Sequence, residues 1–544
     1  MDYPWHKHYA KDVPHTLDYP AISLYQLLKN TAAEHPEFLA MTFNDQDTTY
    51  GELDEKVDKF AAILRQQGVS KGDRVALILI NSPIYVIAFF ALMKLGAVVV
   101  NLSVGVTGGE LASCLNNSGA RLAITLDLFA QNLYRVIKDT SLEKVILHSV
   151  FGLEKKLADS EGVPRPQVYA DLMAQAPAAD EPASAVSPDD VAVLQHTSGS
   201  TGVPKAATLT HANLVASIYQ SNAWVGAHDA GNAAVICAIP FFHVFGLTAC
   251  LLISVLKGYR MLLMPRMDAM DILSISKMLQ TYKPISFPAV PSLWRAILSL
   301  SDEAIREQLS SIHVGTSGGA PLPPELHQRY RAVTGSNIVE TYGLSEASSA
   351  THMAPYPQGA PMGSVGVPLP DVQAKIMDLE TGRHECAPGE VGEMVIKGPQ
   401  VMKGYWNQPG LTAEKLRDGW LYTGDLARVD QDGFFYLVDR KDDMIISHGF
   451  NVYPGQIEEL LKEHPAVRDA AVIGVDDQLR GQAIVAVVAL KEGASVKKDE
   501  LKAFCKERLP DYRLPKSILI REVIPRDPAG KLLRRVLRQD IAGA

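Results

Sequence analysis

Continuous apolar runs recur along the N-terminal part of the chain, at Arg74–Ile80, Arg121–Thr125 and Lys144–His148. Such runs are typical of parallel strands that are covered on both faces of a sheet. Segments with amphipathic helical spacing accompany them, at Ser23–His35 and from Thr49 to Gln67. The alternation of buried strands with amphipathic helices predicts a layered α/β fold.

The most hydrophobic stretch of the sequence is Ile84–Val100. It contains Lys94 and Gly96, and a charge in the middle of a bilayer is costly. Its apolar part is also short for a membrane-spanning helix. We therefore expect a buried helix that ends at Leu95 and a strand at Ala97–Asn101.

The pattern changes twice further along the chain. A second α/β series has apolar strands expected at Ala234–Ile239, Arg260–Met264, Pro284–Phe287, Ser311–Gly315 and Ser336–Val339. Glycine-punctuated segments at Val372–Met377, Glu390–Lys397 and Phe434–Val438 predict a barrel-like or antiparallel unit. After Arg440 a smaller α+β segment follows. The expected architecture is a large N-terminal domain, residues 1–440, of two α/β layered subdomains and a β-barrel-like subdomain, followed by a small α+β C-terminal domain, residues 441–544.

Composition excludes several classes of protein. The 544 residues are too many for one core, and 47% hydrophobic with 21% charged residues is typical of a soluble globular protein. The net charge of −9 argues against generic nucleic-acid binding, which needs a basic surface. The 5 cysteines have no metal-ligand spacing and are expected to be reduced thiols in the cytoplasm. The N-terminus lacks the pattern of a signal peptide.

A Ser/Gly-rich stretch at Gln195–Lys205 follows the apolar strand Val191–Leu194 and precedes an expected helix with Thr210 as its N-cap. Glycines allow close approach of the backbone to an anion, and hydroxyls with a lysine add donors. The ordinary P-loop pattern is not met, because Val203 and Pro204 separate Gly202 from the lysine. The stretch is either a different phosphate-binding loop or an ordinary surface loop.

Five other stretches carry chemically useful side chains: Ile239–Leu247, Val314–Leu322, Val339–Ala347, Gly419–Leu426 with Asp439–Ile445, and Ile524–Lys531. Each also has an ordinary structural explanation, such as a core histidine, a strand exit, a capped helix start, an Asx turn or a solvated lysine. A carboxylate in the third could hold Mg²⁺. An aspartate in the fourth could accept both hydroxyls of a ribose.

Taken in order, these stretches resemble the motifs of the acyl-adenylate-forming superfamily. The Ser/Gly-rich loop, Tyr342–Glu346, Tyr422–Asp425, Asp439–Asp443 and Gly530–Lys531 follow one another as in that family. The resemblance covers nearly the whole chain. Three segments are most similar to bacterial long-chain fatty-acid–CoA ligases: Pro4–His15, Pro240–Val244 and Lys397–Trp406.

The resemblance implies a two-step reaction. A fatty-acid carboxylate attacks the α-phosphate of ATP to give acyl-AMP and pyrophosphate, and coenzyme A then displaces AMP. Phosphoryl chemistry of this kind depends on positioning and charge neutralisation more than on acid–base groups. The alternatives are a medium-chain or aryl acid–CoA ligase, a carrier-loading adenylation domain, and an inactive member that serves as a binding protein.

The resemblance also assigns roles by position. The phosphates would be held by Thr197, Ser198, Gly199, Ser200, Thr201, Gly202 and Lys205. The adenine slot would be formed by Gly318, Gly319, Ala320, Glu340, Thr341 and Tyr342. Thr341 would also touch the α-phosphate, Glu346 would hold Mg²⁺ with Thr201 nearby, and Lys531 would stabilise charge during adenylation.

The remaining assignments concern the ribose, the acyl chain and coenzyme A. Asp425 would bind the ribose with Arg440 beside it, and His243 and Gly343 would belong to the acyl pocket. Asp442 marks the hinge about which the C-terminal domain rotates between the half-reactions. Ser447, His448 and Gly449 would meet coenzyme A.

The chain departs from the family pattern at a few positions. His196 stands where many relatives have tyrosine, Ala206 where glycine is usual, and His448 where glycine is usual, beside the expected path of the thiol. Asn101–Thr107 lacks the usual Asn-Pro-x-Tyr pattern. The resemblance allows a homodimer and peripheral contact of a cytoplasmic protein with the inner face of the cell membrane.

Overall fold

The structure is a computed structural model that describes residues 3–150, 164–176, 184–197, 205–226, 233–265, 272–447, 450–477, 481–526 and 532–542. The chain divides into two compact units. The first comprises Met1–Gln373 and Lys397–Leu421, and the second comprises Ala374–Ile396 and Tyr422–Ala544. Each unit has apolar clusters of its own. This division does not test where the chain hinges, so the boundary between residues 440 and 441 stays a prediction.

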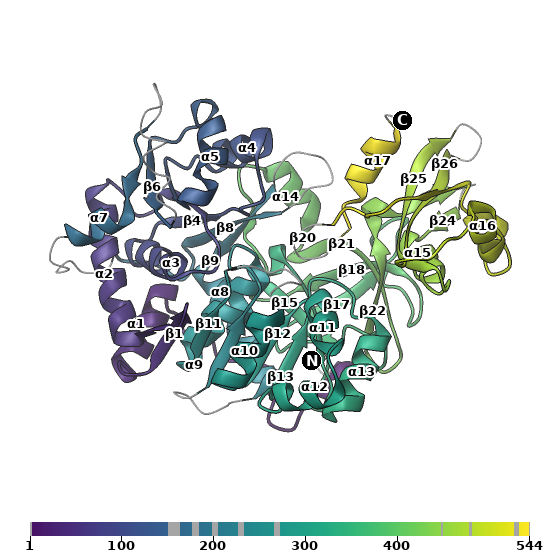
Figure 1. The fold of residues 1–544 in the computed structure, drawn as a ribbon, viewed down its shortest axis with the longest axis horizontal. Coiled ribbons are helices and arrows are strands. Elements are labelled where there is room, and N and C mark those ends of the chain that lie inside the picture. Colours follow the sequence, from purple (N-terminus) through teal and green to yellow (C-terminus); the bar gives the residue numbers. More distant parts are fainter. Residues whose placement is uncertain are drawn as a thin grey trace. The chain divides into compact units, whose positions relative to one another are not determined.

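An eight-stranded sheet forms one half of the first unit, in the order β19-β9-β8-β4-β3-β5-β6-β7 (Figure 1). Its strands are β3 (Arg74–Ile78), β4 (Val98–Asn101), β5 (Leu122–Leu126), β6 (Lys144–His148), β7 (Gln167–Val168), β8 (Val191–Thr197), β9 (Lys205–Thr210) and β19 (Gly404–Tyr405). The strands from β8 to β7 are parallel, whereas β9 and β19 are antiparallel additions. The predicted buried strands of the first series are confirmed.

A nine-stranded sheet forms the other half, in the order β16-β15-β14-β13-β12-β10-β11-β1-β2. Its strands are β1 (Leu39–Phe43), β2 (Gln46–Thr49), β10 (Ala234–Cys237), β11 (Arg260–Leu263), β12 (Ser286–Ala289), β13 (Val314–Ser317), β14 (Val339–Leu344), β15 (Ser349–Met353) and β16 (Val367–Pro368). Its centre is parallel, as expected for strands joined through helices.

The helices of the first unit are α1 (Leu24–Glu34), α2 (Tyr50–Gln66), α3 (Pro83–Leu95), α4 (Gly108–Ser118), α5 (Asp127–Val136), α7 (Tyr169–Ala174), α8 (His211–Val225), α9 (Ile253–Lys257), α10 (Ile272–Tyr282), α11 (Pro291–Leu298), α12 (Asp302–Leu309), α13 (Pro324–Thr334) and α14 (Pro409–Lys415). Helix α8 contacts both β9 and β15, so it lies between the two sheets (Figure 1). Thr49 and Thr210 cap α2 and α8 with reciprocal capping boxes, which confirms the N-cap expected at Thr210.

Helix α3 is the apolar stretch for which the sequence predicted burial rather than a membrane span. It ends at Leu95, and Gly96 follows in the left-handed conformation that favours glycine. The Lys94 ammonium lies 2.6 Å from Oδ1 of Asp58, which explains how a charge is kept in a buried helix. In the part of the chain that the structure describes, no helix is long and apolar enough to cross a membrane.

The second unit contains two small sheets. One of them consists of β17 (Gln373–Met377), β18 (Gly392–Lys397), β21 (Trp420–Val429) and β22 (Phe435–Arg440). The division between the two units passes through the ends of these strands. A short strand, β20 (Leu416–Arg417), pairs with the start of β21. The other consists of β23 (Ile445–Ser447), β24 (Phe450–Val452), β25 (Val467–Asp477), β26 (Gly481–Leu490) and β27 (Ser517–Ile520). Its helices are α15 (Pro454–Lys462), α16 (Lys498–Lys506) and α17 (Arg534–Ala542).

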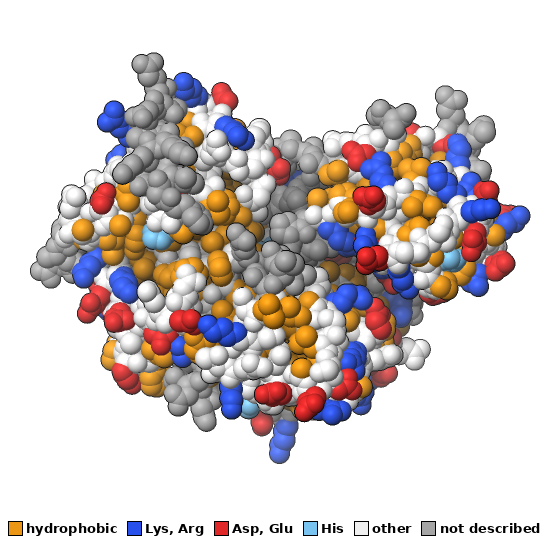
Figure 2. All heavy atoms as spheres, viewed as in Figure 1, with side chains coloured by type: hydrophobic (Ala, Val, Ile, Leu, Met, Phe, Trp, Pro, Cys, Tyr) orange, Lys and Arg blue, Asp and Glu red, His pale blue; other side chains and the backbone are white. Residues whose placement is uncertain are grey.

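The mixed α/β class with a large N-terminal and a smaller C-terminal part is confirmed. Several local features were not expected from the sequence. β9 pairs with β8, so the Ser/Gly-rich stretch connects the two strands of a β-hairpin. β14 and β15 form another hairpin, and Gly246–Leu252 is a π-helix, η3. Acidic and basic side chains are interspersed on the described surface in Figure 2, without a dominant basic patch on the face shown.

Candidate active site

The predicted phosphate loop is the connection between β8 and β9. Thr197, the last residue of β8, and Lys205, the first residue of β9, are cross-strand partners at the two ends of this connection. Ser198, Gly199, Ser200, Thr201 and Gly202 lie outside the described residues. Burial lowers the pKa of His196 to about 4, so the ring beside the loop is neutral near pH 7. The structure therefore brings the two described members of the predicted phosphate site together.

Glu346 lies on a short 3₁₀ turn, η5 (Ser345–Ala347), that follows β14 and packs against β8 and β9. The Tyr405 hydroxyl donates to Oε1 of Glu346 at 2.8 Å, and Met402 N–H donates to its carbonyl oxygen at 2.8 Å. Because Tyr405 pairs with Ala207, these contacts hold the Glu346 carboxylate beside β9. A half-buried carboxylate of this kind suits Mg²⁺, which is commonly held by one or two carboxylates together with substrate phosphates.

The predicted adenine slot is built where β13 ends beside β14. A Cβ on Gly318 would lie 2.7 Å from Cγ2 of Thr341, so only glycine fits without displacement. Gly319 has φ +80°, which also favours glycine. Leu322 N–H donates to Oε1 of Glu340 at 3.2 Å, which ties the turn after β13 to β14. Burial raises the pKa of Glu340 to about 7, and this hydrogen bond opposes the shift.

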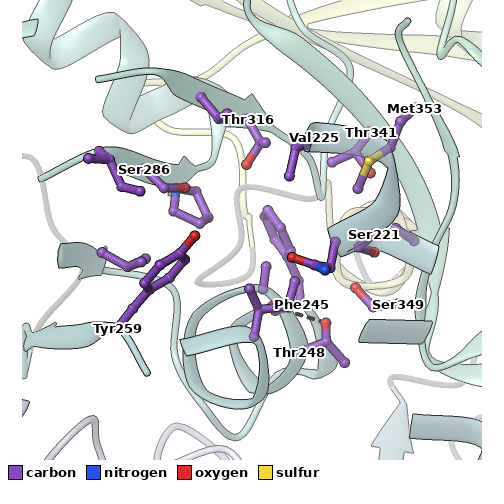
Figure 3. Close-up of a pocket in the computed structure, with 18 of the residues that line it drawn as sticks. Ser221, Val225, Phe245, Thr248, Tyr259, Ser286, Thr316, Thr341, Ser349 and Met353 are labelled. Atoms are coloured by element: carbon purple, nitrogen blue, oxygen red, sulfur yellow. Dashed lines mark hydrogen bonds between the residues drawn. The ribbon is translucent and has the colours of Figure 1, made fainter. Parts of the chain in front are cut away.

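Thr341 also borders a cavity in the first unit, shown in Figure 3. The space not filled by atoms is about 700 Å³, part of which is open solvent. Most lining residues are apolar and come from α8, η3, α9, the nine-stranded sheet and the residues next to these elements: Val225, Val235, Phe245, Ala249, Ile253, Tyr259, Ile285, Pro288, Val314, Ala350 and Met353. Hydroxyls contribute at Ser221, Thr248, Ser286, Thr316, Thr341 and Ser349. An apolar cavity with a few polar groups is the usual form of a small-molecule site.

The two residues assigned to the acyl pocket lie near this cavity in sequence, but neither is among its lining residues in the part of the chain that the structure describes. His243 accepts a hydrogen bond at Nδ1 from Phe245 N–H, at 3.2 Å, in the segment before η3. Gly343 is required by the β14–β15 hairpin, because a Cβ there would lie 1.9 Å from the Ser349 carbonyl oxygen. Their contact with an acyl chain stays a prediction.

A buried polar network fixes the segment that carries His243. The Asn81 amide donates to the carbonyls of Cys237 and Ile239, both at 2.9 Å, and accepts from Phe241 N–H at 2.7 Å. Gln195, in the second half of β8, donates to the Phe242 carbonyl at 2.8 Å. The network fixes this segment beside both sheets, and sequence reasoning missed it because its members are far apart in the chain.

In the second unit, Asp425 and Arg440 are cross-strand partners in β21 and β22, and Nε of Arg440 lies 3.1 Å from Oδ1 of Asp425. The Asp425 side chain is buried, whereas Arg440 is exposed. The structure thus places these two predicted ribose-site residues side by side. An ionised carboxylate has several acceptor positions, so an arginine and two ribose hydroxyls can share it.

The other predicted groups of the second unit are only partly described. Asp442 is exposed on a 3₁₀ turn, η6 (Lys441–Asp443). Ser447 pairs with Phe450 in the β23–β24 hairpin and is buried. His448, Gly449 and Lys531 lie outside the described residues. In the described part of the chain, no group of three or more His, Cys, Asp or Glu side chains is arranged to hold a metal ion.

The site residues that the sequence did not reveal are mainly those lining the cavity. Ser221 and Val225 lie on α8 and Thr248 on η3, in segments without a motif, whereas Thr316 lies on β13 inside the stretch Val314–Leu322 but was not itself assigned a role. In Figure 3 these side chains converge from different elements around Phe245. The only sequence signal was indirect, since glycines at 246 and 318 mark places of close approach; a Cβ on Gly246 would lie 2.2 Å from the Pro240 carbonyl oxygen.

Comparisons with known proteins identify the family. The family model described as AMP-binding enzyme matches residues 28–406, and the AMP-binding enzyme C-terminal domain matches residues 456–531. The chain is 39% identical over 552 residues to a long-chain-fatty-acid–CoA ligase of Bacillus subtilis, covering 99% of this chain and 98% of the relative. It is 36% identical over 560 residues to the ligase of the same name from Salmonella typhimurium, with coverage of 99% and 98%.

A solved structure shows the same architecture. ATP-bound MatB from Rhodopseudomonas palustris superimposes with a TM-score of 0.84 at 26% identity, covering 95% of this chain and 99% of that chain. The family model alone spans more than half of the sequence. The resemblance inferred from the motifs is therefore confirmed, and the chain belongs to the family of AMP-binding enzymes.

Proposed function

We propose that the chain is an ATP-dependent long-chain-fatty-acid–CoA ligase. In the first step the fatty-acid carboxylate forms a bond to the α-phosphorus of ATP and pyrophosphate leaves with the electrons of the broken bond. In the second step the sulfur of coenzyme A forms a bond to the acyl carbon, and AMP leaves. The observation that carries the proposal is the mostly apolar cavity that borders Thr341 on β14.

The cavity could hold the acyl chain against apolar side chains, with the carboxylate of the fatty acid next to Thr341. An acyl chain lying along Phe245, Ala249 and Val225 would be desolvated by apolar side chains, each buried methylene contributing about 0.8 kcal/mol. Its carboxylate would then lie at the Thr341 end, where the α-phosphate is expected. The hydroxyl of Thr341 donates to the His352 carbonyl at 3.3 Å, so its position is fixed before substrate binds.

The roles assigned to individual residues are part of the proposal. The loop from Thr197 to Gly202 with Lys205 holds the β- and γ-phosphates, and Glu340 to Tyr342 with Gly318 to Ala320 frames the adenine. Asp425 binds the ribose beside Arg440. Lys531 neutralises charge where carboxylate and α-phosphate meet, which lowers the barrier by electrostatic stabilisation.

Magnesium and coenzyme A complete the proposed set of ligands. Glu346 would hold Mg²⁺ with Thr201 nearby, and the cation would neutralise phosphate charge. The Tyr405 hydroxyl orients the Glu346 carboxylate for such a role. Ser447, His448 and Gly449 would contact coenzyme A, and Asp442 would be the hinge between half-reactions. A cytoplasmic location, peripheral membrane contact and a homodimer are kept as predictions.

A substrate panel tests the proposal. The protein is incubated with ATP, Mg²⁺ and coenzyme A and with each acid from acetate through palmitate, together with benzoate, and AMP and thioester are scored. We expect equal amounts of AMP and thioester, with the highest kcat/KM on a long-chain acid. A maximum on benzoate or on a short acid would contradict the fatty-acid assignment, and formation of ADP would contradict the reaction type.

A further inference from the structure

The cavity beside Thr341 has a buried hydroxyl in its wall, that of Thr316 on β13. Thr316 is only 8% exposed, and among the described residues its Oγ1 has no hydrogen-bond partner. In Figure 3 this oxygen points into the cavity. A buried hydroxyl without a partner is destabilising, so its presence in a cavity wall calls for an explanation.

The other two threonine hydroxyls of the described wall are already used by the protein. Thr248 on η3 donates to the Val244 carbonyl at 2.9 Å, and Thr341 on β14 donates to the His352 carbonyl at 3.3 Å. Both hydroxyls therefore have a hydrogen bond before any substrate binds. The Thr316 hydroxyl differs from them because its capacity to donate and to accept is left for a ligand.

The neighbours of Thr316 in the sheet explain why it has no local partner. Its cross-strand partners are Pro288 on β12 and Val339 on β14, and Val314 precedes it on the same face of β13. All three side chains are apolar. The backbone of Thr316 is fixed, since Nε1 of Trp294 donates to its carbonyl at 3.0 Å. The hydroxyl is thus held in a defined place within an apolar surface.

This place is close to the end of the cavity where the reaction is expected. Thr341 lies two residues beyond Val339 on β14, and so on the same face of the sheet as Thr316. With a rise of about 3.3 Å per residue and about 4.8 Å between strands, the two Cα atoms are about 8 Å apart. A fatty acid whose carboxylate lies at Thr341 would therefore pass Thr316 with the first carbons of its chain.

We propose that Thr316 is a specificity-determining residue that binds a hydroxyl on the acyl chain near the carboxylate, and that β-hydroxy long-chain fatty acids are a substrate class of this protein. The inference rests on the proposed function, which places the acyl chain in the cavity. A β-hydroxyl and the Thr316 hydroxyl satisfy each other when both are buried. An unsubstituted chain leaves the Thr316 hydroxyl without a partner.

The experiment uses the full chain with ATP, Mg²⁺ and coenzyme A, and measures kcat/KM from AMP release. The acids are palmitate, β-hydroxypalmitate and ω-hydroxypalmitate, in which the hydroxyl is at the far end of the chain. The variants are Thr316→Val, which removes the hydroxyl and keeps the shape, and Thr316→Ser, which keeps the hydroxyl. Thr248→Val is the matched control, because its hydroxyl borders the same cavity but is bonded to Val244.

For Thr316→Val we expect kcat/KM for β-hydroxypalmitate, relative to palmitate, to fall by about 3- to 10-fold, the usual contribution of one hydrogen bond. The ratio for ω-hydroxypalmitate to palmitate should stay as in the wild-type protein, and Thr316→Ser should restore the β-hydroxy ratio. Thr248→Val should change kcat/KM for all three acids by the same factor. The melting temperature of Thr316→Val should not fall, because replacing an unpaired buried hydroxyl by a methyl group is neutral or stabilising.

Three results would overturn the inference while leaving the proposed function intact. The first is an unchanged β-hydroxy ratio in Thr316→Val, which would show that solvent satisfies the hydroxyl. The second is an equal fall of the β- and ω-hydroxy ratios, and the third is a lower melting temperature of Thr316→Val, which would reveal a structural partner. Failure of the proposed function has a different signature, namely no AMP from the wild-type protein with any of the three acids.

Discussion

The two units hold their candidate chemical groups in place by different means. In the first unit, Thr341 and Glu346 lie on a buried strand and the turn after it, and their side-chain partners are a carbonyl and a hydroxyl. In the second unit, the segment beside the predicted hinge is fixed by ion pairs from Arg534 and Arg538. Apolar packing and single hydrogen bonds from strand and turn positions fix a site rigidly, whereas networks of ion pairs depend strongly on geometry and on every partner being present.

This difference suggests a division of labour between the units. The first unit contains the residues proposed for the adenine and the acyl group, and both of these stay bound through the two half-reactions. The second unit carries the predicted ribose residues Asp425 and Arg440 together with groups needed in one half-reaction only, such as Lys531. Substitution of Lys531 should therefore separate the two half-reactions, and substitutions that line the acyl cavity should not.

The largest effect is expected for Lys531→Ala. Removing the charge where two anions meet should slow adenylation by about 100- to 1,000-fold, a typical cost for losing an electrostatic contact in the transition state. Thioester formation from supplied palmitoyl-AMP should be spared. Pyrophosphate exchange and thioester assays measure the two rates, and equal loss of both would contradict the proposed division of labour.

Glu346→Gln is the corresponding change in the first unit. The amide can still accept the Tyr405 hydroxyl, which lies 2.8 Å from Oε1 of Glu346, so the fold should be kept. Loss of the charge should raise the Mg²⁺ concentration for half-maximal adenylation by at least about 10-fold. A Mg²⁺ titration of pyrophosphate exchange checks this. Tyr405→Phe, which keeps the carboxylate charge, should shift the titration less, and the reverse ranking would argue against Glu346 as the ligand.

The acyl cavity can be tested by filling it. Val225 lines it from the end of α8, so Val225→Phe should lower kcat/KM for palmitate more than for octanoate. An overpacked apolar site costs about 1–3 kcal/mol, or roughly 5- to 150-fold. Tyr219→Phe on the same helix, outside the cavity lining, is the matched control. An equal loss on both acids would show that the acyl chain does not reach Val225.

The smallest effect concerns stability rather than activity. Because burial raises the pKa of Glu340 to about 7, the folded protein binds more protons than the unfolded chain between pH 4.5, the ordinary value for this carboxyl, and about 7. Stability from this group is therefore present below its unfolded pKa and lost as the pH rises through the folded value. In Glu340→Gln the melting temperature should decline less between pH 4.5 and about 7 than in the wild-type protein. The same dependence of melting temperature on pH in both proteins would contradict the raised pKa of Glu340.

The elements and the family could be predicted because their signals are local or strongly ordered along the chain. Burial of α3 followed from apolar density with Lys94 and Gly96, and the cap of α8 from the residue type at Thr210. β9 was missed because Lys205 was assigned to the loop, although its pairing with Thr197 makes it the first residue of a strand.

The cavity could not be predicted for a different reason. Ser221, Thr248, Thr316 and Thr341 come from separate elements, and their convergence depends on sheet order, which no local pattern specifies. The ion pair between Arg534 and Asp443 could not be predicted from the sequence either. Arg534 belongs to a basic tail, and such a tail is ordinarily a solvated helix face.

Direct detection of the intermediate tests the central claim most closely. The wild-type protein is mixed with ATP, Mg²⁺ and palmitate without coenzyme A, and bound species are analysed by mass spectrometry before and after coenzyme A is added. The account predicts palmitoyl-AMP, with pyrophosphate released, and its conversion to palmitoyl-CoA and AMP upon addition. Formation of the thioester with ADP and phosphate, or of no acyl-AMP while ATP is consumed, would contradict it.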